Sequence, residues 1–341
     1  MIIMSDDGKL ATGKIPKDVL KRLVFTCLGS PSDRVLKGPM VGEDAALLDM
    51  GDRIIVAKAN PITGAENKIG WLAVHINAND VATRGGKPLW YLSTILLPED
   101  SPESLLETIM KEQHEACCDL GISIVGGHTE VVTGLQRAIV SGFMLGETSP
   151  ESKVTTDGAQ IGDDIILTKG VGLEGTGILA SDMRHRLVDH VSKAQLDSAV
   201  KFLDMVSVVP EALEASKIGG VHSMHTPTEG GVLNGLLEVS EACALGFTVY
   251  EAEMPIHEET VAISEALSID PLKLLSSGSL LMCVDPDMSK AIIDGLKKIN
   301  VNSNVIGKVT EGSYVIIDRN GVKRTVGDVL QDELFRILES E

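Results

Sequence analysis

The sequence contains few aromatic residues, and this scarcity limits what the chain is expected to bind. Phe, Trp and Tyr make up 3% of the 341 residues, so aliphatic side chains must fill the core. Few rings are available to stack on single-stranded nucleic acid. The formal net charge of −19 points the same way, because nucleic-acid phosphates require basic surfaces. We therefore expect no nucleic-acid partner, and a bound nucleotide would need a metal, helix N-termini or backbone N–H groups around its phosphates.

Cysteine pairs and long apolar runs are missing as well. The five cysteines are an odd number with no C-x-x-C spacing, and no signal peptide is evident, so we expect no disulfide framework and a cytoplasmic location. A membrane-spanning helix needs about 18 or more consecutive apolar residues, and the sequence has no such run. It also lacks the Walker G-x-x-x-x-G-K-[ST] motif and the G-x-S-x-G elbow.

The length predicts about two domains of about 150 residues each, and the polar stretch at 147–158 is the best linker candidate, which gives domains at 1–150 and 151–341. Strands and helices do not alternate strictly, so the pattern favours an α+β fold over a doubly wound sheet. Ser101 is expected to cap a long helix that Gly121 ends. Apolar spacing predicts further helices at 17–28, 69–81, 193–206, 231–243 and 258–267, and strands at 53–59, 89–97, 122–125, 137–145, 164–168, 280–284 and 314–318.

Two segments place carboxylates among small and apolar residues. The first reads G-E-D-A-A at 42–46, and the second reads N-A-N-D-V-A at 77–82 near the end of a predicted helix. A buried ionised carboxylate costs several kcal/mol unless it is paired or holds a metal, and Mg²⁺ commonly uses one or two carboxylates together with phosphate oxygens. Two other interpretations stay open: a solvated turn for the first segment, and a buried pair of Asp80 with Arg84 for the second.

Glycine pairs mark two further candidate sites. V-G-G-H-T-E at 125–130 follows a short apolar strand, where paired glycines allow close backbone approach to a ligand, although an ordinary tight turn is the alternative. P-T-E-G-G at 227–231 leads into a helix whose N-terminus would suit an anion. His222 and His225 form an H-x-x-H spacing, but further zinc ligands are lacking. The G-V-G-L-E-G-T-G run at 170–177 departs from the dinucleotide-binding spacing.

Together these motifs resemble a known superfamily over nearly the whole chain. It contains aminoimidazole ribonucleotide (AIR) synthase, thiamine-monophosphate kinase, selenophosphate synthetase and HypE, and the chain is most similar to HypE-like, AIR synthase-related proteins of archaea. The resemblance rests on G-K-I-P at 13–16, P-I-T-G-A at 61–65 and the motifs at 42–46, 77–82 and 227–231. It implies an N-terminal α+β domain that pairs into a barrel across a homodimer, and a C-terminal α/β domain.

The resemblance also implies a chemistry. ATP and Mg²⁺ would occupy a cleft lined by both domains and both subunits, and ATP would activate an oxygen of a small-molecule substrate by phosphorylation. Asp44 and Asp80 match metal-binding positions, and His128 or Glu130 would orient the nucleophile. The positions carried over for nucleotide binding are Asp44, Thr63, Asn79, Asp80, Gly126, Gly127, Thr129, Glu229 and Gly230.

The chain departs from the family pattern at several positions. Asn60, His128 and Thr226 stand where acidic residues are common in the family, which should weaken Mg²⁺ binding. HypE proper carries a cysteine in its C-terminal tail, but no cysteine follows Cys283 here, so carbamoyl dehydration on the chain's own tail cannot occur. Two alternatives remain open: a thiamine-monophosphate-type kinase, and a nucleotide-binding maturation or assembly partner with little turnover.

Overall fold

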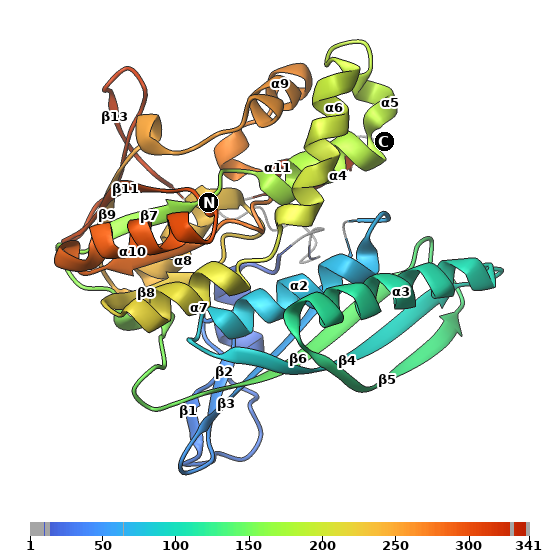
Figure 1. Ribbon diagram of the computed structural model, residues 1–341, viewed down its shortest axis with the longest axis horizontal. Coiled ribbons are helices and arrows are strands. Elements are labelled where there is room, and N and C mark those ends of the chain that lie inside the picture. Colours follow the sequence, from blue (N-terminus) through green and yellow to red (C-terminus); the bar gives the residue numbers. More distant parts are fainter. Residues whose placement is uncertain (1–9, 11–13, 64, 328–330, 339–341) are drawn as a thin grey trace.

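The molecule contains two separate β-sheets, and each sheet packs against its own helices (Figure 1). The computed structural model describes the chain except residues 1–9, 11–13, 64, 328–330 and 339–341. Two short helical segments, α1 (Lys17–Val19) and η1 (Leu20–Val24), precede the first sheet, so the helix predicted at 17–28 ends earlier than expected. Among the described residues no helix is both long and apolar enough to cross a membrane.

The N-terminal domain is built on a six-stranded sheet in the order β1-β2-β3-β6-β4-β5. Strands β4 and β5 run parallel and the other neighbours are antiparallel. The strands are β1 (Val35–Lys37), β2 (Ala46–Asp49), β3 (Ile54–Ile62), β4 (Lys87–Pro98), β5 (Ser123–Val132) and β6 (Ile139–Thr148). Strand β3 begins one residue after the strand predicted at 53–59, and β4 contains the strand predicted at 89–97.

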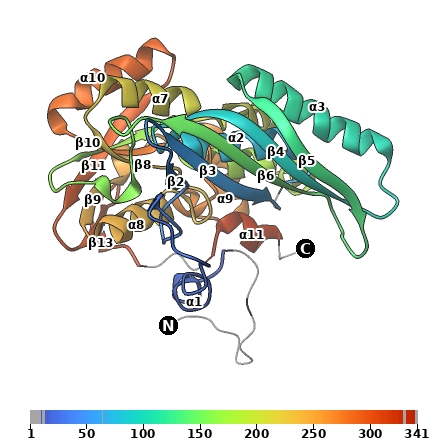
Figure 2. The ribbon, with the colours of Figure 1, turned by 90° about the horizontal axis from the view of Figure 1, so that it is seen from below.

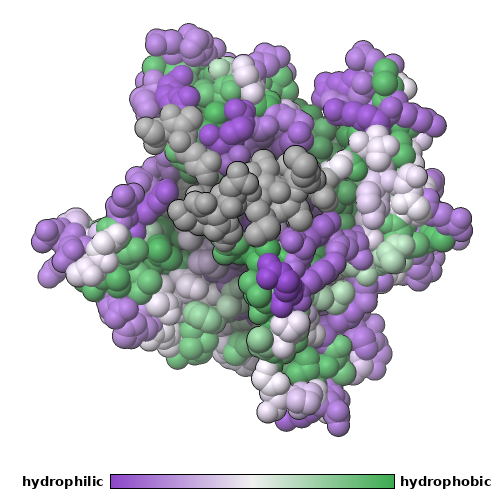
Figure 3. Space-filling model, turned by 180° about the vertical axis from the view of Figure 1, so that it is seen from behind, coloured by the Kyte–Doolittle hydropathy of each residue, from purple (hydrophilic) through white to green (hydrophobic). Residues whose placement is uncertain are grey.

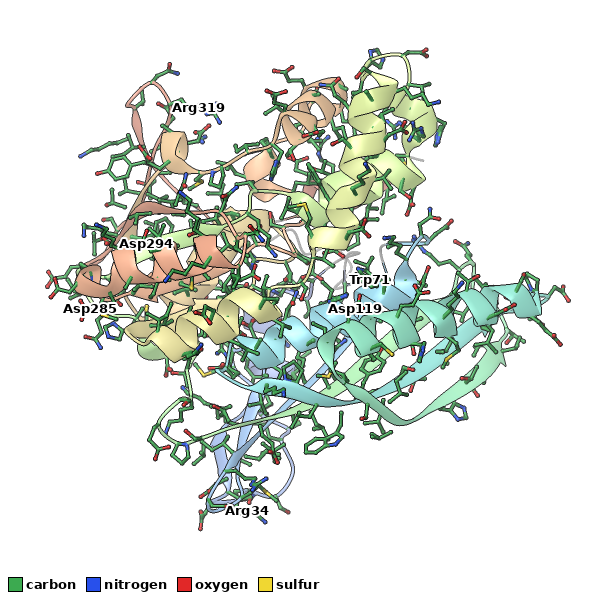
Figure 4. All side chains as sticks on the ribbon, in the orientation of Figure 1. Arg34, Trp71, Asp119, Asp285, Asp294 and Arg319 are labelled. Atoms are coloured by element: carbon green, nitrogen blue, oxygen red, sulfur yellow. The ribbon has the colours of Figure 1, made fainter. Side chains whose placement is uncertain are left out.

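One face of this sheet is covered by α2 (Ile69–Ala82) and α3 (Glu103–Leu120) (Figures 1 and 2). Every residue of α2 except Trp71 is buried, as expected for a helix that is apolar on all sides, and α2 lies between the sheet and the C-terminal domain. Trp71 lies at this boundary (Figure 4), where its Nε1 donates to the Leu203 carbonyl at 3.0 Å. Helix α3 begins after Pro102 without a side-chain cap, so the predicted Ser101 cap is wrong, whereas Gly121 ends the helix with a left-handed φ of 68°.

The C-terminal domain contains a seven-stranded sheet in the order β13-β12-β9-β11-β7-β10-β8, antiparallel except between β9 and β12. Side chains alternate between its faces: Ile166 and Met282 pack with α7 and α10, whereas Ile165 and Leu281 pack with α8. The strands are β7 (Asp164–Thr168), β8 (Val221–His225), β9 (Gly246–Tyr250), β10 (Leu281–Val284), β11 (Ser303–Thr310), β12 (Tyr314–Ile317) and β13 (Lys323–Thr325).

The remaining helices surround this sheet or form a helical group above α2 (Figure 1). Helices α8 and α9 begin and end where the sequence predicts, whereas the helix predicted at 193–206 is split into α6 and a 3₁₀ segment, η3. The helices are α4 (Leu173–Asp182), α5 (Arg184–Leu187), α6 (Lys193–Val200), α7 (Val209–Ile218), α8 (Gly231–Cys243), α9 (Glu258–Leu267), α10 (Pro286–Lys298) and α11 (Glu333–Leu338), with 3₁₀ segments η2 (Thr156–Gly158), η3 (Lys201–Met205), η4 (Glu251–Glu253) and η5 (Pro271–Lys273).

Candidate functional site

A cleft between the two domains is the candidate site. Its volume is about 430 Å³, which includes open solvent at its mouth. The end of β3 and the middle of α2 form one wall, with Asn60, Thr63 and Ile76. Thr228 and Glu229 stand on the opposite wall, before α8. Two of the residues predicted from sequence, Thr63 and Glu229, therefore line one cavity.

The N-terminus of α8 already binds an anionic side chain at this cleft. Gly230 donates its backbone N–H to Asp332 Oδ2 at 2.6 Å, and Asp332 Oδ1 accepts from Leu334 N at 2.7 Å. Gly230 and Gly231 both have left-handed φ, and a Cβ at Gly231 would lie 2.5 Å from the Leu272 carbonyl oxygen, so only glycine fits there. The predicted anion site at Gly230 thus holds a carboxylate supplied by the C-terminal segment, which the sequence analysis missed.

Two acidic groups at this end of the cleft have strongly shifted pKa values. Burial raises the pKa of Asp332 to about 7, even though the N–H groups that bind it favour its charged form. Burial likewise raises the pKa of Glu174 to about 7, against a hydrogen bond from Ser277. Glu174 and Ser277 both line the cleft. Perturbed acids in a cavity are a common mark of a functional site.

The predicted metal ligands lie beside the cleft, where Asp80 is buried and the Asp44 side chain is 9% exposed, and every oxygen of the two carboxylates faces a donor group of the protein. Asp80 Oδ2 lies 2.8 Å from Lys58 Nζ, and Asp80 Oδ1 accepts from Thr226 Oγ1 at 2.9 Å. Asp44 Oδ1 lies 2.9 Å from His225 Nδ1. The other oxygen, Asp44 Oδ2, lies 3.2 Å from the Thr83 hydroxyl and 3.4 Å from Arg84. The partner of Asp80 is therefore Lys58 and not Arg84.

His225 and Arg84 connect the two domains within the same cluster. His225 Nε2 lies 2.9 Å from Glu238 Oε2 on α8. Burial opposes the charge on His225, but Asp44 and Glu238 outweigh it and raise its pKa to about 10. Arg84 is fully buried and contacts Glu43, the Thr156 hydroxyl at 2.7 Å and the Met224 carbonyl.

This donor set does not fit a divalent metal ion. Mg²⁺ requires free oxygen ligands, whereas each oxygen of Asp44 and Asp80 faces a cation or hydroxyl donor of the protein. Of the two histidines in the H-x-x-H spacing, His225 binds Asp44 and Glu238, while His222 Nδ1 lies 3.0 Å from Asp163. Within the described part of the chain, no three His, Cys, Asp or Glu side chains are grouped so as to hold a metal.

Asn79 joins the two domains through its side-chain amide. Its Nδ2 donates to the Val206 carbonyl and its Oδ1 accepts from the Val208 N–H, both at 2.7 Å. Asn79 is buried, and both of its amide heavy atoms are committed to these backbone groups. The geometry thus gives Asn79 a structural role between α2 and the segment that precedes α7.

The glycine pair and the predicted catalytic residues lie on the edge strand of the N-terminal sheet. Gly126 and Gly127 continue β5, so the alternative of an ordinary tight turn does not apply: a Cβ at Gly127 would lie 2.3 Å from the Ser93 carbonyl oxygen of the neighbouring strand. His128, Thr129 and Glu130 follow on the same strand, and all of them are exposed. His128 Nε2 lies 3.3 Å from Glu130 Oε2.

Within one chain, this edge strand lies apart from the cleft. Register pairs Asn60 of β3 with Gly142, Gly142 with Ser93, and Ser93 with Gly127. Three strand spacings, or about 14 Å, therefore separate Asn60 from Gly127. Asn60 and Thr226 lie near Asp80, but His128 does not belong to that cluster in the single chain.

Comparison with known proteins agrees with this arrangement. Residues 42–148 match the family model of the AIR synthase related protein N-terminal domain, and residues 160–319 match that of its C-terminal domain. A protein of Methanocaldococcus jannaschii, provisionally named a hydrogenase expression/formation protein, is 27% identical over 96% of this chain and 97% of its own length. Carbamoyl dehydratase HypE of Cupriavidus necator is 29% identical over 87% of this chain and 86% of its own.

Solved structures show the same fold. The structure of hydrogenase maturation protein HypE in complex with ATP has a TM-score of 0.72 at 19% identity and covers 95% of this chain and 97% of its own. The structure of ThiL complexed with AMPPCP and TMP has a TM-score of 0.72 at 19% identity, with 93% and 98% coverage. The two family models match both domains in chain order, so the chain belongs to the AIR synthase related family.

Proposed function

We propose that the chain binds ATP in the cleft between its domains and uses it to phosphorylate an oxygen of a small-molecule substrate, in the manner of a HypE-like enzyme. The observation that carries this proposal is the N-terminus of α8, where the Gly230 N–H holds the Asp332 carboxylate at 2.6 Å. A phosphate offers the same negative oxygen to the same group. Similar proteins named HypE, one of them solved with ATP, support the choice of ligand.

The cleft supplies hydroxyl donors for such a ligand. Thr63, Thr228 and Ser277 line it from different elements of both domains. Glu174, whose pKa of about 7 allows it to exchange a proton near neutral pH, stands beside Ser277. Glu174 is therefore the residue in the described cleft best suited to take the proton of an attacking oxygen.

The acceptor in this proposal is a small-molecule substrate. Cys283 is buried in β10 and is therefore not placed to act as an acceptor. Measurement of ADP release distinguishes the two alternative functions of the chain. A thiamine-monophosphate-type kinase, the activity suggested by the ThiL likeness, would release ADP with thiamine monophosphate, whereas a maturation partner with little turnover would bind ATP without releasing ADP. A structure of a HypE–HypF complex supports a maturation-protein partner for such a role.

We also propose that a second copy of the chain covers the open face of the N-terminal sheet. No helix of the described residues covers this face (Figure 2), and Phe143 there is 42% exposed. Strand β5 pairs with β4 on one side only, and no described strand pairs with its outer edge. Its Val125 and Val131 are 53% and 60% exposed, and exposed apolar edges commonly mark interfaces. Seen from behind, the lower part of the molecule carries hydrophobic residues among hydrophilic ones (Figure 3). A homodimer could bring His128 and Glu130 of the partner subunit towards the cleft.

Nucleotide binding and turnover test the function separately. Titration with the fluorescent analogue mant-ATP should show saturable binding, and Thr228→Val should weaken it about tenfold, the usual effect of losing one hydrogen bond to a charged group. Thr325→Val, at an exposed site on β13, is the matched control. ADP release in the presence of a metabolite mixture would support the enzyme, whereas binding without ADP release in every mixture would refute it in favour of the maturation partner. Absence of mant-ATP binding would overturn both.

A further inference from the structure

The cluster around Asp44 and Asp80 contains as many cations as carboxylates. Its members come from the N-terminal arm, the N-terminal domain, β8 and α8, and contacts run from Lys14 at one end to Glu43 at the other. The four carboxylates are Glu43, Asp44, Asp80 and Glu238, and the four cationic groups are Lys14, Lys58, Arg84 and His225. Each carboxylate of the cluster therefore faces at least one cationic group of the protein.

Lys58 occupies the position where a bound cation would meet Asp80. Its Nζ lies 2.8 Å from Asp80 Oδ2, and its charge also acts on Asp44. The second oxygen of Asp80 is taken by Thr226 at 2.9 Å. A divalent ion at this place would have to displace the ammonium of Lys58, and it would add positive charge to a cluster whose carboxylates already face cationic groups, which is costly in a low-dielectric interior.

We propose that Lys58 is the resident cation of this site: Asp80 holds its ammonium group, Asp44 beside it is paired with His225 and Arg84, and the two carboxylates recruit no divalent metal. Buried carboxylates are stabilised either by a metal or by paired donors, and in this chain the paired donors are complete. Thr226 contributes because its hydroxyl donates to Asp80, whereas an acidic side chain at the same position would repel it.

The Lys58–Asp80 pair is also close to the cleft. Lys58 and Asn60 are two residues apart on β3 and so share a face of the sheet. Asp80 and Ile76 are four residues apart on α2 and so share a face of the helix. Asn60 and Ile76 both line the cleft, and the Lys58 side chain keeps 20% of its surface exposed, against 4% for Asp80. The ammonium group is thus placed to meet an anionic ligand at this end of the cleft, an extension that rests on the proposed ATP binding.

Divalent-ion binding without nucleotide tests the central claim. Titration with Mn²⁺, followed by electron paramagnetic resonance, should detect no bound ion on the wild-type protein at submillimolar concentration. The variant Lys58→Met with Thr226→Asp removes the ammonium and adds a carboxylate, and it should bind one Mn²⁺ per chain at least about tenfold more tightly than wild type. Lys308→Met, which breaks a comparable pair with Asp164 on the C-terminal sheet, should bind no more than wild type. Stoichiometric Mn²⁺ binding to wild type that Asp80→Asn abolishes would overturn the proposal.

Two further measurements, thermal unfolding and mant-ATP binding, separate a failure to fold and a failure of the proposed function from a wrong assignment of Lys58. If the double variant fails to fold, Mn²⁺ should restore its cooperative thermal transition, and failure of both folding and rescue would count against the proposal. Lys58→Arg retains the charge and should remain free of Mn²⁺; tight binding to it would also refute the assignment. With mant-ATP, wild type should keep its affinity within about threefold when EDTA replaces Mg²⁺, and Lys58→Met should lose about tenfold. Absence of mant-ATP binding would defeat the proposed function, while the Mn²⁺ result would still decide the role of Lys58.

Discussion

The charge on His225 should make the stability of the protein depend on pH in the alkaline range. This ring lies between Asp44 of the N-terminal domain and Glu238 of α8, with both contacts at 2.9 Å. The folded state raises its pKa from 6.5 to about 10, which corresponds to about 5 kcal/mol of preferential binding of the proton to the folded state. Because the folded pKa is the higher one, this stabilisation is complete below pH 6.5 and is lost as the pH rises towards 10.

Urea denaturation across this pH range measures the effect. The free energy of unfolding of wild type should fall with pH by up to about 1.4 kcal/mol per unit more steeply than that of His225→Gln. Lysines and cysteines titrate in both proteins, so the difference between the slopes isolates His225. The control His114→Gln changes an exposed histidine on α3 and should keep the wild-type slope.

A second readout does not depend on the variant being stable. The NMR signal of the His225 ring C2–H in wild type should titrate with a midpoint near 10. Parallel slopes for wild type and His225→Gln, together with a ring that titrates near 6.5, would refute the reasoning, because the ring would then carry no extra charge in the folded state.

Three further changes test the domain boundary, the core and the cleft. Asn79→Ala leaves two buried backbone groups of the C-terminal domain unpaired and should lower the free energy of unfolding in urea by about 2–4 kcal/mol; an effect below about 1 kcal/mol would mean that water replaces the amide. Gly142→Ala should cost about 1–3 kcal/mol by overpacking, because its Cβ would lie 2.4 Å from a buried side-chain nitrogen, whereas Gly327→Ala, with nothing within 4 Å, should be neutral in the same assay. Asp332→Ala removes the carboxylate from the N-terminus of α8 and should tighten mant-ATP binding about five- to tenfold; unchanged affinity would show that this carboxylate does not compete with phosphate.

The sequence predicted those helices whose ends or apolar faces are determined by neighbouring residues in the chain. Helix α8 begins and ends as expected, because Gly230 and Gly231 fix its start with left-handed backbone. Helix α2 was recognised from its apolar run, and the cleft residues Thr63 and Glu229 were found because they belong to motifs that the family shares. The two-domain α+β organisation was predicted from the chain length, the mixed order of strands and helices and the family resemblance, and the two matching family models confirm the two-domain organisation.

Partners far apart in the sequence could not be predicted. The charge on Asp80 is compensated by Lys58, on a strand 22 residues earlier, and Asp332 reaches Gly230 across 102 residues. Sequence spacing identifies a helical neighbour such as Arg84, but it gives no indication of which strand a helix packs against. The glycine pair of β5 allowed two interpretations for a related reason: glycine signals both turns and close strand contacts, and only the Ser93 carbonyl beside Gly127 decides between them.

The complete burial of Arg84 bears on how the two domains can evolve. This residue belongs to the N-terminal domain, yet it donates to the Thr156 hydroxyl in the connecting segment and to the Met224 carbonyl of the C-terminal sheet. A domain exchanged with a relative would have to supply both acceptors at the same positions, since a stranded guanidinium has no access to water. The two domains match separate family models, but the buried contacts of Arg84 join them physically. We expect a chimaera joined at the linker to fold only if it keeps the acceptor groups of Arg84.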